Sequence, residues 1–222
     1  MEKGKLIVIE GACDGIGKTT QFNMLKERLE KEGETVITHH FPSYHTPQGA
    51  DVEKYLRGEF GKPEDLDPYF IHSLYAKDRE VTWNTLLKPE IELGHTVLLD
   101  RYTTSSIIYQ ASTIKDWEER KKFIDYICKN EYHERGVGEP DKIIFLHAPF
   151  DLVTKARQNR KTNDGIENDI HERDLSFMRG VYDNAMQVAE YLNWDMVDCS
   201  NGEGLDTKEH IHEKVYSKIK RS

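Results

Sequence analysis

The sequence contains few cysteines and no long hydrophobic run. Its three cysteines, Cys13, Cys128 and Cys199, are widely spaced and include no CxxC pair. This odd, scattered set argues against a disulfide framework or a cysteine zinc site and fits a reducing compartment. The apolar run at 6–9 is only as long as a strand and stops at Glu10, so the sequence predicts neither a signal peptide nor a membrane span. We therefore expect a cytoplasmic protein.

Basic residues are also in the minority. The 222 residues include 31 Lys and Arg against 40 Asp and Glu, which gives a formal net charge of −9. Nucleic acids and anionic membranes bind basic faces, so this balance disfavours both as partners. A small anionic ligand held by a few local Arg and Lys side chains stays compatible with it. The chain has no internal repeat, low-complexity tract or linker, and we predict a single domain over 1–222.

Short apolar segments alternate with helical patterns along the chain. The predicted strands lie at 5–10, 35–41, 95–100, 142–146 and 195–199. Between the first two strands, Phe22, Leu25 and Leu29 share one face of a helix. A long helical stretch begins at 68, and Pro89 predicts a kink or a new helix start within it. The alternation predicts an α/β fold of three layers, with a five-stranded parallel sheet and helices on both of its faces.

A glycine-rich turn with irregular spacing follows the first predicted strand. The segment EGACDGIGKTTQ at 10–21 contains Gly-Lys-Thr. The usual phosphate-binding pattern would place its first glycine at Ala12, but the glycine stands one residue earlier, at Gly11. We expect the additional residue to form a bulge near 12–13 and to leave the rest of the turn unchanged.

The residue types in this turn suit the phosphates of ATP. Gly15 and Gly17 allow backbone N–H groups to turn toward phosphate oxygens, and the start of the next helix adds partial positive charge. Lys18 can reach the β- and γ-phosphates, and Thr19 can offer its hydroxyl to Mg²⁺. The sequence therefore predicts a P-loop NTPase fold. The predicted ATP-binding residues are Gly15, Ile16, Gly17, Lys18, Thr19 and Thr20.

A second acidic landmark lies at the end of the third predicted strand. In LLDRY at 98–102, Asp100 ends the strand and Arg101 follows it. A carboxylate at this place can organise Mg²⁺, and a guanidinium beside it can hold a phosphate with its planar set of donors. Including Asp14 in the glycine-rich turn, the candidate metal ligands are Thr19, Asp100 and Asp14.

Five motifs in order resemble the thymidylate kinases, and the resemblance covers nearly the whole chain. They are the glycine-rich turn at 10–21, FPSY at 41–44, LYAKDRE at 74–80, DRYTTSSIIYQ at 100–110 and DIHERD at 169–174. The resemblance implies transfer of the γ-phosphoryl group of ATP to the 5′-phosphate of dTMP, which gives dTDP. It also implies ATP and Mg²⁺ as cofactors and a homodimer as the assembly.

The resemblance also implies a binding site for dTMP. Tyr75 takes the place of an aromatic that stacks on thymine, and Arg79 that of an arginine that hydrogen-bonds an exocyclic oxygen of the base. Arg101 resembles the arginine that grips the 5′-phosphate, and Tyr109 an aromatic that leaves no room for a ribose 2′-OH. The implied substrate residues are Asp14, Phe41, Pro42, Tyr44, Tyr75, Arg79, Arg101, Ser106, Tyr109, Gln110, His171 and Glu172.

The catalytic arginine of this family comes from the phosphate loop in some members and from a lid in others. The residue after Asp14 is Gly15, so the loop supplies no arginine here. A polar, glycine-containing segment without periodicity predicts a short lid at about 157–171, with Arg160 as the first candidate and Arg157 as the second. The expected catalytic residues are Lys18, Arg160, Arg157, Asp14 and Arg101.

The sequence also departs from the common family pattern. Ser43 stands where many relatives have an arginine that reaches the substrate phosphate. Lys77 and Asp78 stand where an Ala-Asn pair is common. Two other functions stay open. One is a related P-loop kinase for deoxynucleosides or other nucleoside monophosphates, in which Glu10 would act as a base on a sugar hydroxyl. The other is a nucleotide-binding protein without turnover, which the irregular loop favours.

Overall fold

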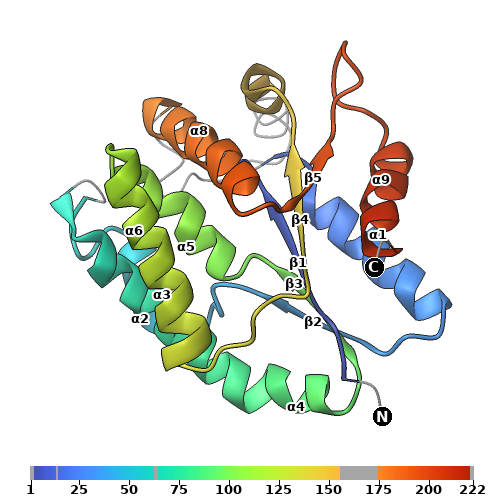
Figure 1. Ribbon diagram of the computed structural model, residues 1–222, viewed down its shortest axis with the longest axis horizontal. Coiled ribbons are helices and arrows are strands. Elements are labelled where there is room, and N and C mark those ends of the chain that lie inside the picture. The colour runs from blue at the N-terminus through green and yellow to red at the C-terminus, as the bar shows by residue number, and fades with distance from the viewer. Residues whose placement is uncertain (1–2, 14, 63–64, 156–174, 221–222) are drawn as a thin grey trace.

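A five-stranded parallel sheet forms the centre of the computed structural model, which describes residues 3–13, 15–62, 65–155 and 175–220 (Figure 1). The strands are β1 (Leu6–Gly11), β2 (Val36–His40), β3 (Thr96–Asp100), β4 (Lys142–His147) and β5 (Asp195–Asp198). Their order in the sheet is β2-β3-β1-β4-β5, and each pair of neighbours is parallel. The predicted strands and the predicted parallel sheet are confirmed.

Helices cover both faces of this sheet. They are α1 (Lys18–Lys31), α2 (Ala50–Leu56), α3 (Pro68–Thr82), α4 (Lys88–Glu92), α5 (Thr103–Tyr109), α6 (Trp117–Cys128), α8 (Leu175–Tyr191) and α9 (Lys208–Lys220). Residues 150–155 are also helical. The α1 and α9 helices pack on one face, and α3 to α6 with α8 pack on the other (Figure 1). None of the described helices is long and apolar enough to cross a membrane.

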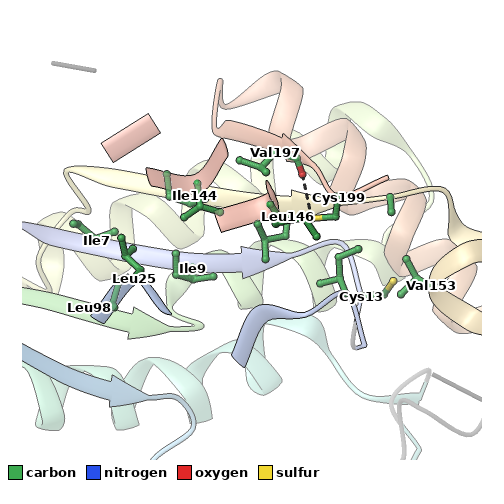
Figure 2. Close-up of a cluster of buried hydrophobic side chains, with 14 of the residues drawn as sticks. Ile7, Ile9, Cys13, Leu25, Leu98, Ile144, Leu146, Val153, Val197 and Cys199 are labelled. Carbon is green, nitrogen blue, oxygen red and sulfur yellow. Dashed lines mark hydrogen bonds between the residues drawn. The ribbon is translucent and has the colours of Figure 1, made fainter. Parts of the chain in front are cut away.

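The central strand explains why this arrangement is stable. Every residue of β1 is buried, as expected for a parallel strand that is covered on both faces. Ile7 and Ile9 point into the cluster beneath α1 and α9, which Figure 2 shows from close by. Leu6 and Val8 point into the opposite cluster, beside the α3–α4 segment. The alternation of a strand thus supplies apolar side chains to both layers of helices.

The helical stretch that begins at Pro68 changes its geometry just before Pro89. Between α3 and α4 lies a π-helical turn, η2 (Trp83–Leu87), at whose end the Lys88 N–H donates to the Trp83 carbonyl five residues earlier. Proline has no N–H to continue the α-helical ladder, and a wider turn accommodates that loss. The predicted new start is confirmed, since α4 begins at Lys88.

The sheet topology brings the sequence motifs to one edge. Since β1 lies between β3 and β4, the carboxyl ends of these three strands lie side by side. Ile9 is the register partner of Asp100, and the Arg101 N–H donates to the Ile9 carbonyl at 3.2 Å. The glycine-rich turn and the DRY motif are therefore neighbours in space. Ligands of open α/β sheets commonly bind at this edge.

Candidate active site

The glycine-rich turn connects β1 to α1 through two left-handed residues. Gly15 and Gly17 have φ angles of +94° and +99°. A side chain at either position would be strained, so the turn depends on glycine there. Helix α1 begins directly afterwards with Lys18, which is only 8% exposed. The start of this helix offers partial positive charge and backbone N–H groups to an anion.

Gly11 permits a close approach of the Lys18 side chain to the end of β1. A Cβ atom at Gly11 would lie 2.8 Å from Cγ2 of Ile16 and 3.1 Å from Cδ and Cγ of Lys18. Real Cβ atoms essentially never come as close as 2.8 Å, so a larger residue would push these side chains away. The glycine that stands one residue too early in the sequence therefore still has a part in the phosphate loop.

The additional residue of the loop is accommodated beyond the strand. The ladder between β1 and β4 is unbroken up to Gly11, and the Ala12 N–H donates to the Leu146 carbonyl at 2.9 Å. Ala12 is fully buried in the cluster of α5, α6 and α8. Cys13 is buried in the opposite cluster, near Val153 (Figure 2). The strand itself contains no bulge, and the two residues extend the core past its end.

Asp100 lies beside this loop as an ionised carboxylate. Its Oδ2 accepts a hydrogen bond from His40 Nδ1 at 3.1 Å. Burial acts to raise the pKa of Asp100, but the hydrogen bond from His40 and the charges of Lys18 and Arg101 outweigh it and lower that pKa. Its Oδ1 is buried without a hydrogen-bond partner among the described residues. A charged oxygen of this kind fits a ligand cation or a water bound to one.

The metal would depend on the nucleotide as well as on the protein. Among the described residues, no group of three or more His, Cys, Asp or Glu could hold a metal ion alone. Thr19 is exposed at the start of α1. Asp14, the third predicted ligand, lies outside the described residues. Mg²⁺ usually binds one or two protein oxygens together with substrate phosphates and waters. Thr19 and Asp100 fit this coordination pattern.

A pocket with about 620 Å³ of empty space, including the solvent at its mouth, opens at the same edge of the sheet. It is lined by Phe41, Pro42, Tyr44, Leu56, Tyr75, Arg79, Arg101, Tyr102, Ser105, Ser106, Tyr109, Gln110 and Met178. Every predicted substrate residue in the described part of the chain is in this set. Arg157, Arg160, His171 and Glu172, like Asp14, lie outside the described residues. No sequence motif indicated Leu56, Tyr102, Ser105 or Met178 as pocket residues.

Arg101 has an unusual backbone conformation in this pocket. Its φ angle is +67°, in the left-handed region that favours glycine. Its guanidinium donates from Nη1 to the Tyr109 hydroxyl at 3.4 Å and lies over the Tyr109 ring, 5.5 Å from the centroid. A strained residue of this kind costs about 1 kcal/mol or more and is frequent at functional sites. The Arg101 side chain lines the pocket.

Arg79 lies at the back of the pocket and is almost completely buried. Its Nε and Nη2 donate to the two carboxylate oxygens of Glu131, both at 2.6 Å. Nη2 also donates to Ser106 Oγ at 2.7 Å, and Nη1 donates to the Tyr102 carbonyl at 3.3 Å. The guanidinium is 5.9 Å from the centroid of the Tyr75 ring. The structure thus brings the predicted base-contacting residues together and adds Glu131, which no motif indicated.

Ser43 and Asp78, two departures from the family pattern, contact each other. The Ser43 N–H donates to Asp78 Oδ2 at 2.7 Å. Ser43 Oγ lies 3.1 Å from Thr82 Oγ1 and 2.9 Å from His39 Nε2. Ser43 is buried and does not line the pocket, whereas its neighbours Pro42 and Tyr44 do. Helix α3 therefore fixes the FPSY loop through a residue that points away from the pocket.

Glu10 is a structural carboxylate in this arrangement. Its Oε1 accepts from the Gly11 N–H at 3.0 Å, and its Oε2 accepts from Thr104 Oγ1 at 2.9 Å and Ser105 Oγ at 2.6 Å. The side chain is fully buried and does not line the pocket. The two hydrogen bonds to Oε2 join the end of β1 to α5. This geometry disfavours Glu10 as a general base on a sugar hydroxyl.

His72 is buried beside the Arg79–Glu131 pair. Its Nδ1 is 3.6 Å from Glu131 Oε1, and neither ring nitrogen has a hydrogen-bond partner among the described residues. Burial lowers the pKa of His72 to about 4, although the charge of Glu131 opposes this change and that of Arg79 adds to it. The imidazole is therefore neutral in the folded protein at neutral pH.

The neutral state of His72 predicts a loss of stability in acid. The unfolded chain protonates this histidine near pH 6.5 and the folded chain near pH 4, so the unfolded state binds more protons within this window. The contribution of His72 to the free energy of unfolding is complete above pH 6.5. It falls as the pH drops and is smaller by about 2 kcal/mol at pH 5. Urea unfolding at pH 7.5 and pH 5 gives the loss of unfolding free energy between these pH values. This loss should be about 2 kcal/mol smaller in His72→Leu than in the unmodified chain. In His133→Gln, at an exposed histidine, it should equal that of the unmodified chain. An unchanged pH dependence in His72→Leu would contradict this assignment.

Comparison with known proteins identifies similar sequences and a similar structure. Residues 9–211 match the sequence profile of thymidylate kinases. A thymidylate kinase from Halothermothrix orenii is 34% identical, with 98% of this chain and 97% of that protein covered. One from Exiguobacterium sibiricum is 31% identical, with 92% of both covered. The solved structure of a thymidylate kinase from Candida albicans has the same fold, with a TM-score of 0.73, 21% identity, and 98% of this chain and 91% of that chain covered.

Proposed function

The chain belongs to the thymidylate kinase family, and we propose that it transfers the γ-phosphoryl group of ATP to the 5′-phosphate of dTMP, giving dTDP and ADP. The observation that carries this proposal is the pocket beside the phosphate loop, in which Arg101, Arg79 and Tyr75 meet. Phosphoryl transfer requires two anionic reactants held in line and their charge neutralised, with little covalent help from the protein. A loop for one reactant next to a pocket for the other meets this requirement.

The phosphate loop holds ATP in this proposal. The residues from Gly15 to Thr20 surround the phosphates, and Lys18 neutralises charge on the β- and γ-phosphates. Thr19 and Asp100 would hold Mg²⁺, with Asp14 as a further candidate outside the described residues. When bound, the ion would neutralise part of the charge on the phosphates. The buried, ionised oxygen of Asp100 supports this assignment.

The pocket holds dTMP in this proposal. Arg101 binds the 5′-phosphate, Tyr75 stacks on the base, and Arg79 with Ser106 contacts its edge. Tyr109 occupies the space that a 2′-OH would need. The remaining wall is formed by Phe41, Pro42, Tyr44 and Gln110, to which the structure adds Leu56, Tyr102, Ser105 and Met178.

Residues outside the described ranges complete the proposed site. On the resemblance to the family, we assign Asp14, His171 and Glu172 to the binding of dTMP. A lid at about 157–171 supplies the catalytic arginine, with Arg160 before Arg157 in preference. We further propose a single kinase domain over 1–222 that acts as a cytoplasmic homodimer and has neither nucleic acid nor membrane as a partner.

An assay of ADP release with dTMP, dUMP, dCMP and thymidine as acceptors tests this function. We expect the highest kcat/KM for dTMP and a value at least about 10³-fold lower for thymidine, which has no phosphate for Arg101 to bind. ADP release with thymidine but not with dTMP would favour a deoxynucleoside kinase. ATP binding without ADP release for any acceptor would favour a nucleotide-binding protein without turnover.

A further inference from the structure

We infer that Glu131 is a positioning residue that holds Arg79 in the orientation required to recognise the base of the acceptor nucleotide. The inference rests on the proposed function, because it concerns the pocket assigned there to dTMP. Glu131 lies in η4, a π-helical turn (Lys129–Glu134) that follows α6, whereas Arg79 lies in α3. Two separate elements thus meet behind the pocket. π-Helical turns occur frequently at functional sites.

The contact between these residues fixes the guanidinium in both position and rotation. Two parallel hydrogen bonds of 2.6 Å join Nε and Nη2 of Arg79 to the two oxygens of Glu131. Glu131 is itself held, because its Oε2 accepts from Thr103 Oγ1 at 2.8 Å and its side chain is fully buried. A two-point contact leaves the planar guanidinium one orientation, which a single contact would not.

Counting donors shows what this orientation presents to the pocket. A guanidinium has five N–H groups. Two bind Glu131, one binds Ser106 Oγ and one binds the Tyr102 carbonyl. Among the described residues, the remaining Nη1 N–H has no partner, and Arg79 lines the pocket. The pocket therefore receives a single donor from Arg79 and no acceptor.

A single donor distinguishes pyrimidine bases by the group at their 4-position. Thymine and uracil carry a carbonyl oxygen there, which accepts a hydrogen bond, whereas cytosine carries an amino group, which donates. Placing a donor against the amino group leaves both donors unpaired in a buried site, at a substantial cost in binding. Glu131 would thus act on specificity through the orientation of Arg79.

Stability alone gives little reason to bury this ion pair. Removing two charges from water costs several kcal/mol per ion, and well-packed apolar residues often stabilise a protein equally well. Asp78, the other carboxylate near Arg79, accepts from the Ser43 N–H and does not hold the guanidinium. Without Glu131, Arg79 would lose its two strongest contacts, and its side chain would be free to turn.

Steady-state kinetics of Glu131→Gln with dTMP, dUMP and dCMP test the inference. The amide has the same shape but only one acceptor, so the two-point contact is lost. We expect the KM for dTMP to rise at least about tenfold, with a change of less than about twofold in the KM for ATP. The kcat/KM values for dTMP and dUMP should fall by the same factor, and the value for dCMP should fall less. Glu131→Asp, which keeps the charge, should restore part of the loss.

Glu134→Gln is the matched control, because Glu134 is exposed on the same π-helical turn. It should leave all of these constants unchanged. The inference would be overturned if Glu131→Gln leaves the ratio of kcat/KM for dTMP to kcat/KM for dCMP unchanged. An equal rise in the KM values for dTMP and ATP would also overturn it. If Glu131→Gln does not fold, the same ratio is measured in Glu131→Asp. A ratio and a KM for dTMP that both equal those of the unmodified chain would then overturn the inference. An unmodified chain that does not phosphorylate dTMP would instead overturn the proposed function.

Discussion

Lys18→Met should lower kcat by at least about 10³-fold and leave the chain folded. In the proposed reaction the ammonium group of Lys18 neutralises charge that moves toward the β-phosphate as the γ-phosphoryl group leaves. The side chain lies across Gly11 at the end of β1, and its exposure is only 8%. Methionine keeps an unbranched apolar side chain against Gly11 and Ile16 and removes only the charge. The loss should therefore be catalytic rather than structural.

The measurement is kcat at saturating ATP and dTMP, together with a thermal unfolding curve. Lys31→Met is the matched control, because Lys31 lies on the same helix with a side chain that is 78% exposed. This control should retain full activity. If Lys18→Met keeps its kcat within tenfold of the unmodified chain, the phosphate loop does not act as we propose.

Replacing Arg101 by glycine and by alanine should separate activity from stability. Both variants remove the guanidinium that holds the acceptor phosphate, so each should lose at least about 10³-fold in kcat/KM for dTMP. Their stabilities should differ, because the φ angle of +67° is strained for alanine but not for glycine. We expect the glycine variant to be more stable than the alanine variant by about 1 kcal/mol.

Initial rates at varied dTMP and urea unfolding of both variants provide these values. Arg101→Lys adds a third comparison, because it keeps the charge and loses the planar set of donors; we expect it to recover only a small part of the activity. If activity is retained in any of these variants, the acceptor phosphate binds elsewhere. If the glycine and alanine variants are equally stable, the backbone at Arg101 is not strained.

Many of the candidate site residues predicted from the sequence lie in continuous motifs next to strand ends, whereas Tyr75 and Arg79 lie within α3 and were predicted only through the family resemblance. Gly15, Gly17 and Lys18 follow β1 directly, and Asp100 with Arg101 ends β3. In such places the chain order and the parallel topology already determine which residues are neighbours. The fold was predictable for the same reason, since each strand is a short apolar run between clear helical patterns.

The parts that sequence analysis missed depend on packing between distant elements. Glu131 lies in a polar run, KNEYHE, whose composition is typical of a solvent-exposed helix, but Arg79 of α3 and Thr103 of α5 contact its side chain, which is fully buried. Leu56 and Met178 come from α2 and α8, where an apolar residue signals burial but not the pocket that it lines. Periodicity identifies a buried face, but it does not identify the neighbour that covers this face.

The contact between Ser43 and Asp78 has a consequence for recombination between relatives. The loop that carries Phe41, Pro42 and Tyr44 is held by the same helix that carries Tyr75 and Arg79. Both walls of the pocket therefore depend on each other and have to be exchanged together, although more than thirty residues separate them in the chain. A chimera joined within this interval would combine a loop with a helix selected to hold a different one. Crossovers before β2 or after α4 would keep the loop and helix α3 from the same parent.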